Sequence, residues 1–229
     1  MKRKAFKAAF PHTIPILTGF CFLGLSYGIY MNANGFSFIY PMLMSMLIFG
    51  GSLEFVAVEM LLSPFAPVQV FFMALMIQAR HLFYGLSMLS KFKGMGWKKF
   101  YLIFGMCDET FSINCSVDIP ENVDKGWFML FVTLLNQIYW CVSATLGGII
   151  GSYLPIDTSG ISFVMTAMFV VIFLEQWLKE KNHFSSCLGV LASVICLMLF
   201  GADYFMLPTM AAIILVLTLS KKKLEMVEI

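Results

Sequence analysis

The chain alternates long apolar segments with short polar connections. The eight apolar segments span residues 14–30, 36–62, 68–89, 100–117, 127–150, 161–178, 184–200 and 204–219. A helix that crosses the hydrocarbon core of a bilayer needs about 20 mostly apolar residues. The pattern therefore predicts an all-α polytopic membrane protein with about six to eight transmembrane or re-entrant helices.

Composition supports this class and limits the number of domains. Of the 229 residues, 60% are hydrophobic and 12% are charged, and the mean hydropathy is +0.86. A soluble domain is typically about 25% charged. We therefore expect a single integral membrane domain over residues 1–229.

The second apolar segment is interrupted at its centre. Gly50, Gly51 and Ser52 follow one another there. Each glycine weakens a helix by about 1 kcal/mol relative to alanine. Inside a bilayer, a broken helix persists only where its freed backbone is buried in protein or lines a cavity. The segment 36–62 is therefore predicted to contain a break, whereas 100–117 is predicted as one run.

The basic residues indicate the topology. They form four clusters, at residues 2–7, 91–99, 179–181 and 221–223. The positive-inside rule assigns all four to the cytoplasm. This holds if the segments 36–62 and 161–178 are re-entrant, so that both termini are cytoplasmic and the acidic turn 118–125 lies outside. The alternative, in which both segments cross the membrane fully, remains open.

Internal similarity suggests a repeat. GLSYG (24–28) resembles GGIIG (147–151), and residues 35–50 resemble 160–175. With the topology above, the halves 10–120 and 126–220 are predicted to be inverted relative to each other, as in many transporters. Gly24 and Gly28 also form a small-xxx-small pair, which lets another helix approach closely.

Arg80 lies within an apolar segment, where it costs roughly 2.5–3.5 kcal/mol on insertion scales. Two compatible interpretations account for it. It forms a structural ion pair with Asp108, Glu109 or Glu54, or its guanidinium contacts an anionic ligand group such as a carboxylate. Because Asp108 and Glu109 are adjacent, they point about 100° apart on a helix, and at most one can face Arg80.

The glycine break offers a second candidate site. Its free amides could bind an anion while Glu54 binds a cation or a proton; alternatively, Glu54 caps a helix near the interface. Asn136 belongs to a polar stripe expected to bond other helices. His81 is more typical of a structural histidine than of a proton carrier. The candidate substrate-binding residues are Arg80, Glu54, Gly50, Gly51, Ser52, Tyr84 and Asn136, and the candidate proton carriers are Glu54, Asp108, Glu109 and His81.

Several function classes are excluded or disfavoured. There is no G-x-x-x-x-G-K-[ST] loop for ATP, so direct ATP-driven transport by this chain is excluded. No residues suggest a metal site, a cofactor or a nucleophile with its base, so no enzyme is predicted. The basic clusters are short and adjoin apolar segments, which indicates lipid contact and not nucleic-acid binding.

Six phrases in order carry a family resemblance: GLSYG, GGSLEF, RHLFYGLSML, CDETFSI, LNQIYW and MTAMFVVIFLEQW. Together they resemble the AzlC family of branched-chain amino acid exporters, also called the YgaZ type. The resemblance implies export of leucine, isoleucine, valine and also methionine or azaleucine. It also implies a second, small membrane subunit of the AzlD (YgaH) type.

The expected function is secondary export across the cell membrane, coupled to the proton motive force. A zwitterionic substrate needs a cation for its carboxylate, an anion for its ammonium group and an apolar wall. The candidate residues supply each type. Two alternatives stay open, a passive channel for a small neutral solute and a scaffold subunit that does not itself transport.

Overall fold

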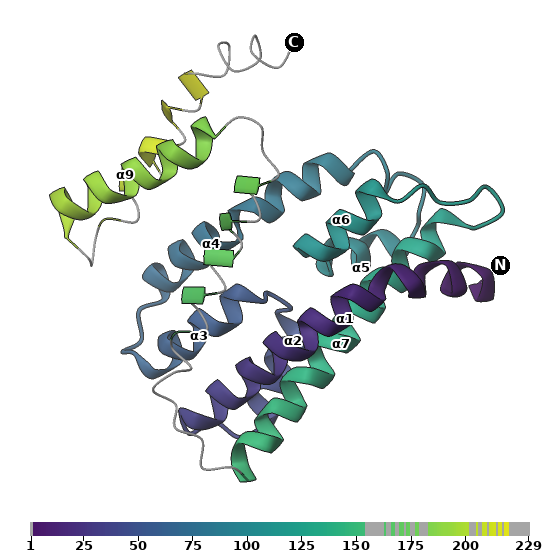
Figure 1. The fold of residues 1–229 in the computed structure, drawn as a ribbon, viewed down its shortest axis with the longest axis horizontal. Coiled ribbons are helices and arrows are strands. Elements are labelled where there is room, and N and C mark those ends of the chain that lie inside the picture. Colours follow the sequence, from purple (N-terminus) through teal and green to yellow (C-terminus); the bar gives the residue numbers. More distant parts are fainter. Residues whose placement is uncertain are drawn as a thin grey trace. The chain divides into compact units, whose positions relative to one another are not determined.

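The chain folds into helices arranged in two compact units, Met1–Met165 and Thr166–Ile229. The structure, a computed structural model, describes residues 2–153, 163, 166, 167, 170, 171, 173, 174, 177, 178, 183–201, 205, 208, 209, 211–213, 215, 216, 218 and 219. These residues contain no strand. The first unit holds α1 (Lys2–Ala33), α2 (Ile39–Leu47), α3 (Ser52–Leu62), α4 (Pro67–Met88), α5 (Lys98–Phe104), α6 (Asp108–Ser116) and α7 (Lys125–Tyr153) (Figure 1).

The described helices confirm an all-α membrane protein. Three of them, α1, α4 and α7, are long and apolar enough to cross a bilayer. In the second unit, α9 (Phe184–Phe200) matches the predicted segment 184–200. The predicted segments 161–178 and 204–219 lie largely outside the described residues, so the re-entrant path of 161–178 and the repeat of the two halves stay predictions.

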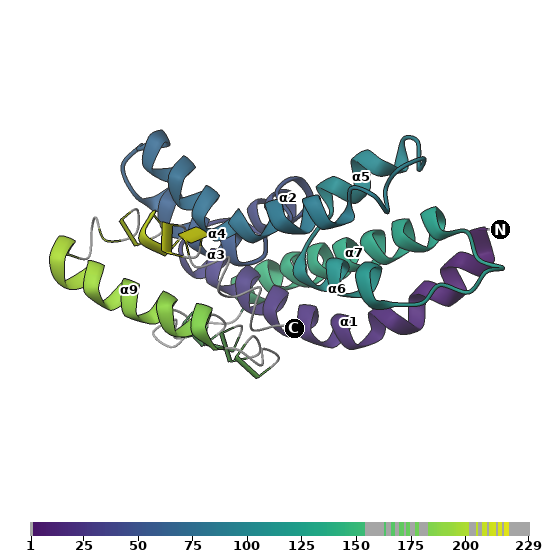
Figure 2. The same ribbon diagram turned by 90° about the horizontal axis from the view of Figure 1, so that it is seen from above.

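Helices α1 and α7 form the frame of the first unit and lie side by side along their length (Figures 1 and 2). A side chain added at Gly28 would collide with the backbone of Ala144 and Gly148, and one added at Gly24 would lie 2.6 Å from the Cβ of Ser143. The predicted close approach through Gly24 and Gly28 is therefore confirmed.

The two frame helices are parallel. Near their starts, the Lys2 ammonium lies 4.4 Å from the centre of the Trp127 ring. Near their ends, Gly151 lies against Asn32. The halves 10–120 and 126–220 were predicted to run in opposite directions, so this orientation is wrong for their first helices.

The starts of α1 and α7 define what we call the lysine end of the unit. Lys98 also lies over the Trp127 ring, at 4.2 Å, and pairs with Asp124 at 3.6 Å. The first two basic clusters therefore share one end, as predicted. The acidic turn 118–125 lies at that end as well, so the prediction that it lies on the opposite side is wrong. The reason is that α5 and α6 return the chain to the end from which they started.

The first hairpin, α2–α3, enters and leaves from the end opposite the lysine end. Gly148, near the end of α7, lies against Phe38 at the start of α2. The chain breaks after Leu47, and α3 then runs back until Glu59 reaches Tyr30 near the end of α1, at 3.5 Å. The predicted break is confirmed. The segment 36–62 also leaves at the end from which it enters, which is the path that a re-entrant segment takes, and re-entry into a bilayer stays a prediction.

The second hairpin, α5–α6, enters and leaves from the lysine end. Helix α4 runs towards that end, where Met88 joins Ala9 and Phe128 in the apolar core. From there α5 enters the unit, and α6 returns until Lys91 binds the carbonyl of Cys115 at 2.9 Å. The run 100–117 was predicted to be uninterrupted, and this is wrong. It breaks at residues 105–107, because Gly105 packs directly on Thr133 and Cys107 is extended.

Candidate functional site

The two helix breaks meet at the middle of α4 and are joined there by Arg80. One guanidinium nitrogen, Nη2, donates to Ser52 Oγ at 3.3 Å, at the start of α3. The other, Nη1, pairs with Asp108 Oδ2 at 2.8 Å, at the start of α6. Two half-helices that run out to opposite ends of the unit thus both begin beside one arginine.

Among the acids predicted as partners of Arg80, the structure selects Asp108. The neighbouring Glu109 lies in the same first turn of α6, and Glu54 is bonded elsewhere. The side chains of Arg80 and Asp108 are 26% and 33% exposed. The ion pair is therefore partly exposed, and it is not enclosed in a dry core.

Glu54 is fully buried and fixed by donors from two helices. Its carboxylate accepts from the Gly50 amide at 2.9 Å and from the Trp140 indole at 3.0 and 3.1 Å. The Gly50 amide is therefore not open to an anionic ligand, which corrects that interpretation. Glu54 does cap α3, since such an acid satisfies an amide before the helix start. It does so in the interior, not near an interface as the alternative supposed.

The break itself needs glycine at one position. Gly51 adopts φ +52 and ψ −101, a sparsely populated conformation that costs a residue with a side chain about 1–3 kcal/mol. Gln78 of α4 donates to the carbonyl of Gly50 at 3.0 Å. Gly50, Gly51 and Ser52 thus shape the break and position Arg80.

Helix α7 connects both hairpins through adjacent side chains. Asn136 donates to Thr110 Oγ1 of α6 at 3.1 Å. Gln137 donates to the Met46 carbonyl of α2 at 3.0 Å and accepts from the Tyr101 hydroxyl of α5. The expectation that Asn136 bonds another helix is confirmed, and Gln137 does the same for two further helices.

An aromatic pair borders the ion pair. Tyr84, one turn after Arg80, stacks on Phe111 of α6 with ring centroids 4.4 Å apart. His81 packs its ring edge-to-face on Tyr84 at 5.6 Å. His81 is thus part of the packing around Tyr84, and Tyr84 with Phe111 forms an apolar wall next to Arg80.

Several buried polar atoms at this junction have no hydrogen-bond partner among the described residues. These are Arg80 Nε, Asp108 Oδ1, Asn136 Oδ1, Gln78 Oε1 and His81 Nδ1. A buried polar atom without a partner costs about 1–3 kcal/mol. Arg80 Nε is thus an unpaired donor, and Asp108 Oδ1, beside the Tyr84 side chain, is an unpaired acceptor; both atoms are buried, and their signs match the two ends of a zwitterion.

Two residues of the site were not proposed as site residues from the sequence. The Trp140 indole donates to Glu54, which lies 86 positions away in the sequence. Phe111 belongs to the phrase CDETFSI, but nothing in its spacing indicates a contact with Tyr84. Both depend on how separate helices pack.

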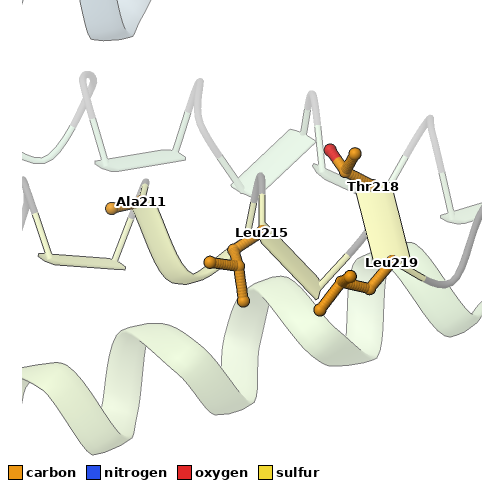
Figure 3. Close-up of a pocket in the computed structure, with 4 residues that line it drawn as sticks. All are labelled: Ala211, Leu215, Thr218 and Leu219. Atoms are coloured by element: carbon orange, nitrogen blue, oxygen red, sulfur yellow. The ribbon is translucent and has the colours of Figure 1, made fainter.

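A shallow apolar depression in the second unit contrasts with this junction. Ala211, Leu215, Thr218 and Leu219 line it (Figure 3). These side chains include no charged group, and none was predicted as a site residue. The four described residues that line the depression therefore offer no charged partner for either end of a zwitterion.

The chain is similar over most of its length to one family of membrane proteins. The model of the family described as AzlC protein matches residues 15–154. The chain is 58% identical over 225 residues to the branched-chain amino acid transport protein AzlC of Bacillus subtilis (strain 168), covering 98% of this chain and 89% of that protein. It is 48% identical to an uncharacterized membrane protein of Haemophilus influenzae, covering 97% and 91% of the two chains.

A more distant relative is the inner membrane protein YgaZ of Escherichia coli (strain K12). It is 23% identical over 216 residues, which cover 80% of this chain and 84% of that protein. No solved structure matches the chain.

Proposed function

The chain belongs to the AzlC family, and on this premise we propose that it is a secondary transporter, not an enzyme, that exports branched-chain amino acids from the cell. The name of the Bacillus subtilis relative supports the substrate class. Leucine, isoleucine and valine are the proposed substrates, with methionine and azaleucine as further ones. The direction is proposed from the family resemblance.

One observation supports the binding site above the others. The Arg80–Asp108 pair keeps Arg80 Nε and Asp108 Oδ1 unpartnered at the point where two half-helices meet. A guanidinium suits a carboxylate, because its nitrogens lie in one plane as a fork. A carboxylate oxygen in turn suits an ammonium group.

In the proposed complex, the substrate carboxylate binds Arg80 and its ammonium group binds Asp108. The free Oδ1 of Asn136 is a further acceptor for the ammonium group. The aliphatic side chain lies against Tyr84 and Phe111. A pocket of this kind distinguishes neighbouring aliphatic side chains weakly, since one methylene is worth only about 1–3 kcal/mol. We therefore expect leucine, isoleucine and valine to share the site.

Two further features belong to the proposal. The lysine end is cytoplasmic, because the first two basic clusters lie there. The chain works with a small membrane subunit of the AzlD type, as the family resemblance implies. A cysteine introduced at Lys93 should then react only with a reagent applied from the cytoplasm; labelling from outside would reverse the orientation.

The test is efflux of labelled leucine from cells loaded with a leucine dipeptide. Cells with the chain and the small subunit should export leucine faster than a deletion strain, and an uncoupler should abolish the difference. Efflux no faster than in the deletion strain contradicts the transporter. Efflux that does not respond to the uncoupler indicates a passive channel.

Arg80 variants separate charge from geometry in the same assay. Arg80→Ala should abolish efflux, and Arg80→Lys should retain a part, because it keeps the charge but loses the fork. Arg3→Ala, in the exposed first turn of α1, is the matched control and should export normally. Normal export by Arg80→Ala would indicate a scaffold, or a substrate site elsewhere.

A further inference from the structure

The two helix breaks carry the same sequence motif. Leu-Ile-Phe-Gly occurs at 47–50 and again at 102–105, and each copy is followed at the same distance by a glutamate, Glu54 and Glu109. All five identities share an offset of 55 residues. In both copies the apolar residues end one arm of a hairpin, and the glutamate lies in the first turn of the next half-helix.

The offset extends to the helices around the motifs. Helix α4 begins at Pro67 and ends at Met88, and the same offset places its counterpart at residues 12–33, where α1 ends at Ala33. Each repeat is thus a long helix followed by a broken hairpin. The first long helix, α1, runs away from the lysine end, and the second, α4, runs towards it. Residues 12–62 and 67–117 therefore form two repeats of opposite orientation.

The glutamates of the two repeats differ in their surroundings. Glu54 is enclosed by the Gly50 amide and the Trp140 indole. Glu109 is only partly buried, and the groups around it are Arg80 and Tyr84 of α4 and, on its own helix, Asp108 and Cys107. Helix α7 bonds the next residue, Thr110, through Asn136, whose Oδ1 is fully buried and unpartnered. One copy of the motif therefore holds a fully buried glutamate, and the other holds a partly exposed one.

We infer that Glu109 and Glu54 are a symmetry-related pair of coupling carboxylates, which exchange the driving proton with the lysine end and with the opposite end respectively. This rests on the proposed transport function and deepens it. In the described state Glu109 is the carboxylate that exchanges its proton with water. Glu54 exchanges its proton when the first hairpin opens. The step moves one proton and no electrons, because the carboxylate accepts H⁺ from water and returns it to water.

A structural role for Glu109 makes a different prediction from a coupling role. A coupling carboxylate is needed to drive substrate uphill, but not for exchange of substrate at equal concentration. Inside-out membrane vesicles with the full chain and its small subunit allow both measurements. One proton driven by 100 mV supports a leucine ratio of about fifty.

The variants are Glu109→Gln, Glu54→Gln and the control Glu121→Gln in the exposed acidic turn. We expect Glu109→Gln to retain leucine exchange and to lose accumulation, so that its ratio falls to about one. Glu54→Gln should also lose accumulation, and Glu121→Gln should match the natural protein. The amount of protein in the membrane, measured by immunoblot, corrects each rate.

The outcomes separate this inference from the proposed function. Normal accumulation by Glu109→Gln, with leucine transport intact in the natural chain, overturns the coupling role alone. Loss of accumulation in only one of the two glutamine variants overturns the pairing. Loss of exchange together with accumulation in Glu109→Gln assigns a binding or structural role instead. Absence of leucine exchange in the natural chain contradicts the transporter itself.

Discussion

The first and second helix breaks begin with the same four residues but end in different environments. In the first, Glu54 is enclosed and accepts three hydrogen bonds from Gly50 and Trp140. In the second, Glu109 stays partly exposed beside the Arg80–Asp108 pair. The difference comes from α7, which presents an indole to one break and a carboxamide to the other. The same local sequence thus makes a closed or an accessible site according to what packs against it.

The largest expected effect comes from removing the two glutamates in turn. Glu54→Leu keeps the volume but leaves the Gly50 amide and the Trp140 indole without an acceptor. Each such donor costs about 1–3 kcal/mol, so we expect a loss of about 4 kcal/mol in the free energy of unfolding. Glu109→Leu should cost about 1 kcal/mol, because Glu109 is partly exposed and the groups that bond its carboxylate, its own amide and the Cys107 thiol, belong to its own segment.

Chemical unfolding in detergent micelles measures this comparison. Trp140→Phe removes the indole donor alone, so it should cost less than Glu54→Leu. Equal losses for Glu54→Leu and Glu109→Leu would show that the two breaks do not differ in the way described.

Replacing a glycine at either break should lower the free energy of unfolding, but for a different physical reason at each break. Gly51→Ala is expected to cost about 1–3 kcal/mol, because the positive φ and negative ψ of Gly51 strain a residue with a side chain. Gly105→Ala is expected to cost about 1–3 kcal/mol by overpacking, because its new methyl meets Thr133 Cγ2.

A second substitution distinguishes the two causes. Thr133→Ser removes Cγ2 and keeps the hydroxyl that donates to Met129. It should restore stability to Gly105→Ala and should not help Gly51→Ala. Rescue of both, or of neither, contradicts these assignments. Unfolding free energies of the four variants decide the matter.

The smallest expected effect is the coupling between Arg80 and Asp108. Both side chains are partly exposed, so their interaction should be worth only about 1 kcal/mol. A double-mutant cycle with Arg80→Ala and Asp108→Ala measures it as the departure from additivity. A coupling above about 3 kcal/mol would indicate a dry structural bridge, which would leave no place for a ligand.

The sequence anticipates the breaks unequally. Two adjacent glycines mark the first break clearly, because both weaken a helix at one point. The second has only Gly105, and the run continues to be apolar on either side of it. The repeated Leu-Ile-Phe-Gly and the acids Asp108 and Glu109, which favour a helix start, could have located it.

The sequence predicts most residues of the site, but it predicts few of the contacts between them. Arg80 stands out because an arginine in an apolar segment is costly. Its choice of Asp108 over Glu54 and Glu109 depends on where separate helices lie, as does the bond from Trp140 to Glu54. The parallel packing of α1 and α7 is likewise a long-range property. The orientation inferred from the basic clusters, the glycine break and the internal similarity was therefore incorrect there.

The central claim is that Arg80 binds the carboxylate of a branched-chain amino acid. The most direct measurement is competition against labelled leucine transport by leucine and by leucinamide, which lacks the carboxylate charge. In the natural chain leucinamide should compete at least about thirtyfold more weakly, because truncating a hydrogen-bonded charge pair costs about 2 kcal/mol or more. In Arg80→Lys, which keeps the charge but loses the fork, this preference should shrink. Equal competition by the two compounds in the natural chain would contradict the claim.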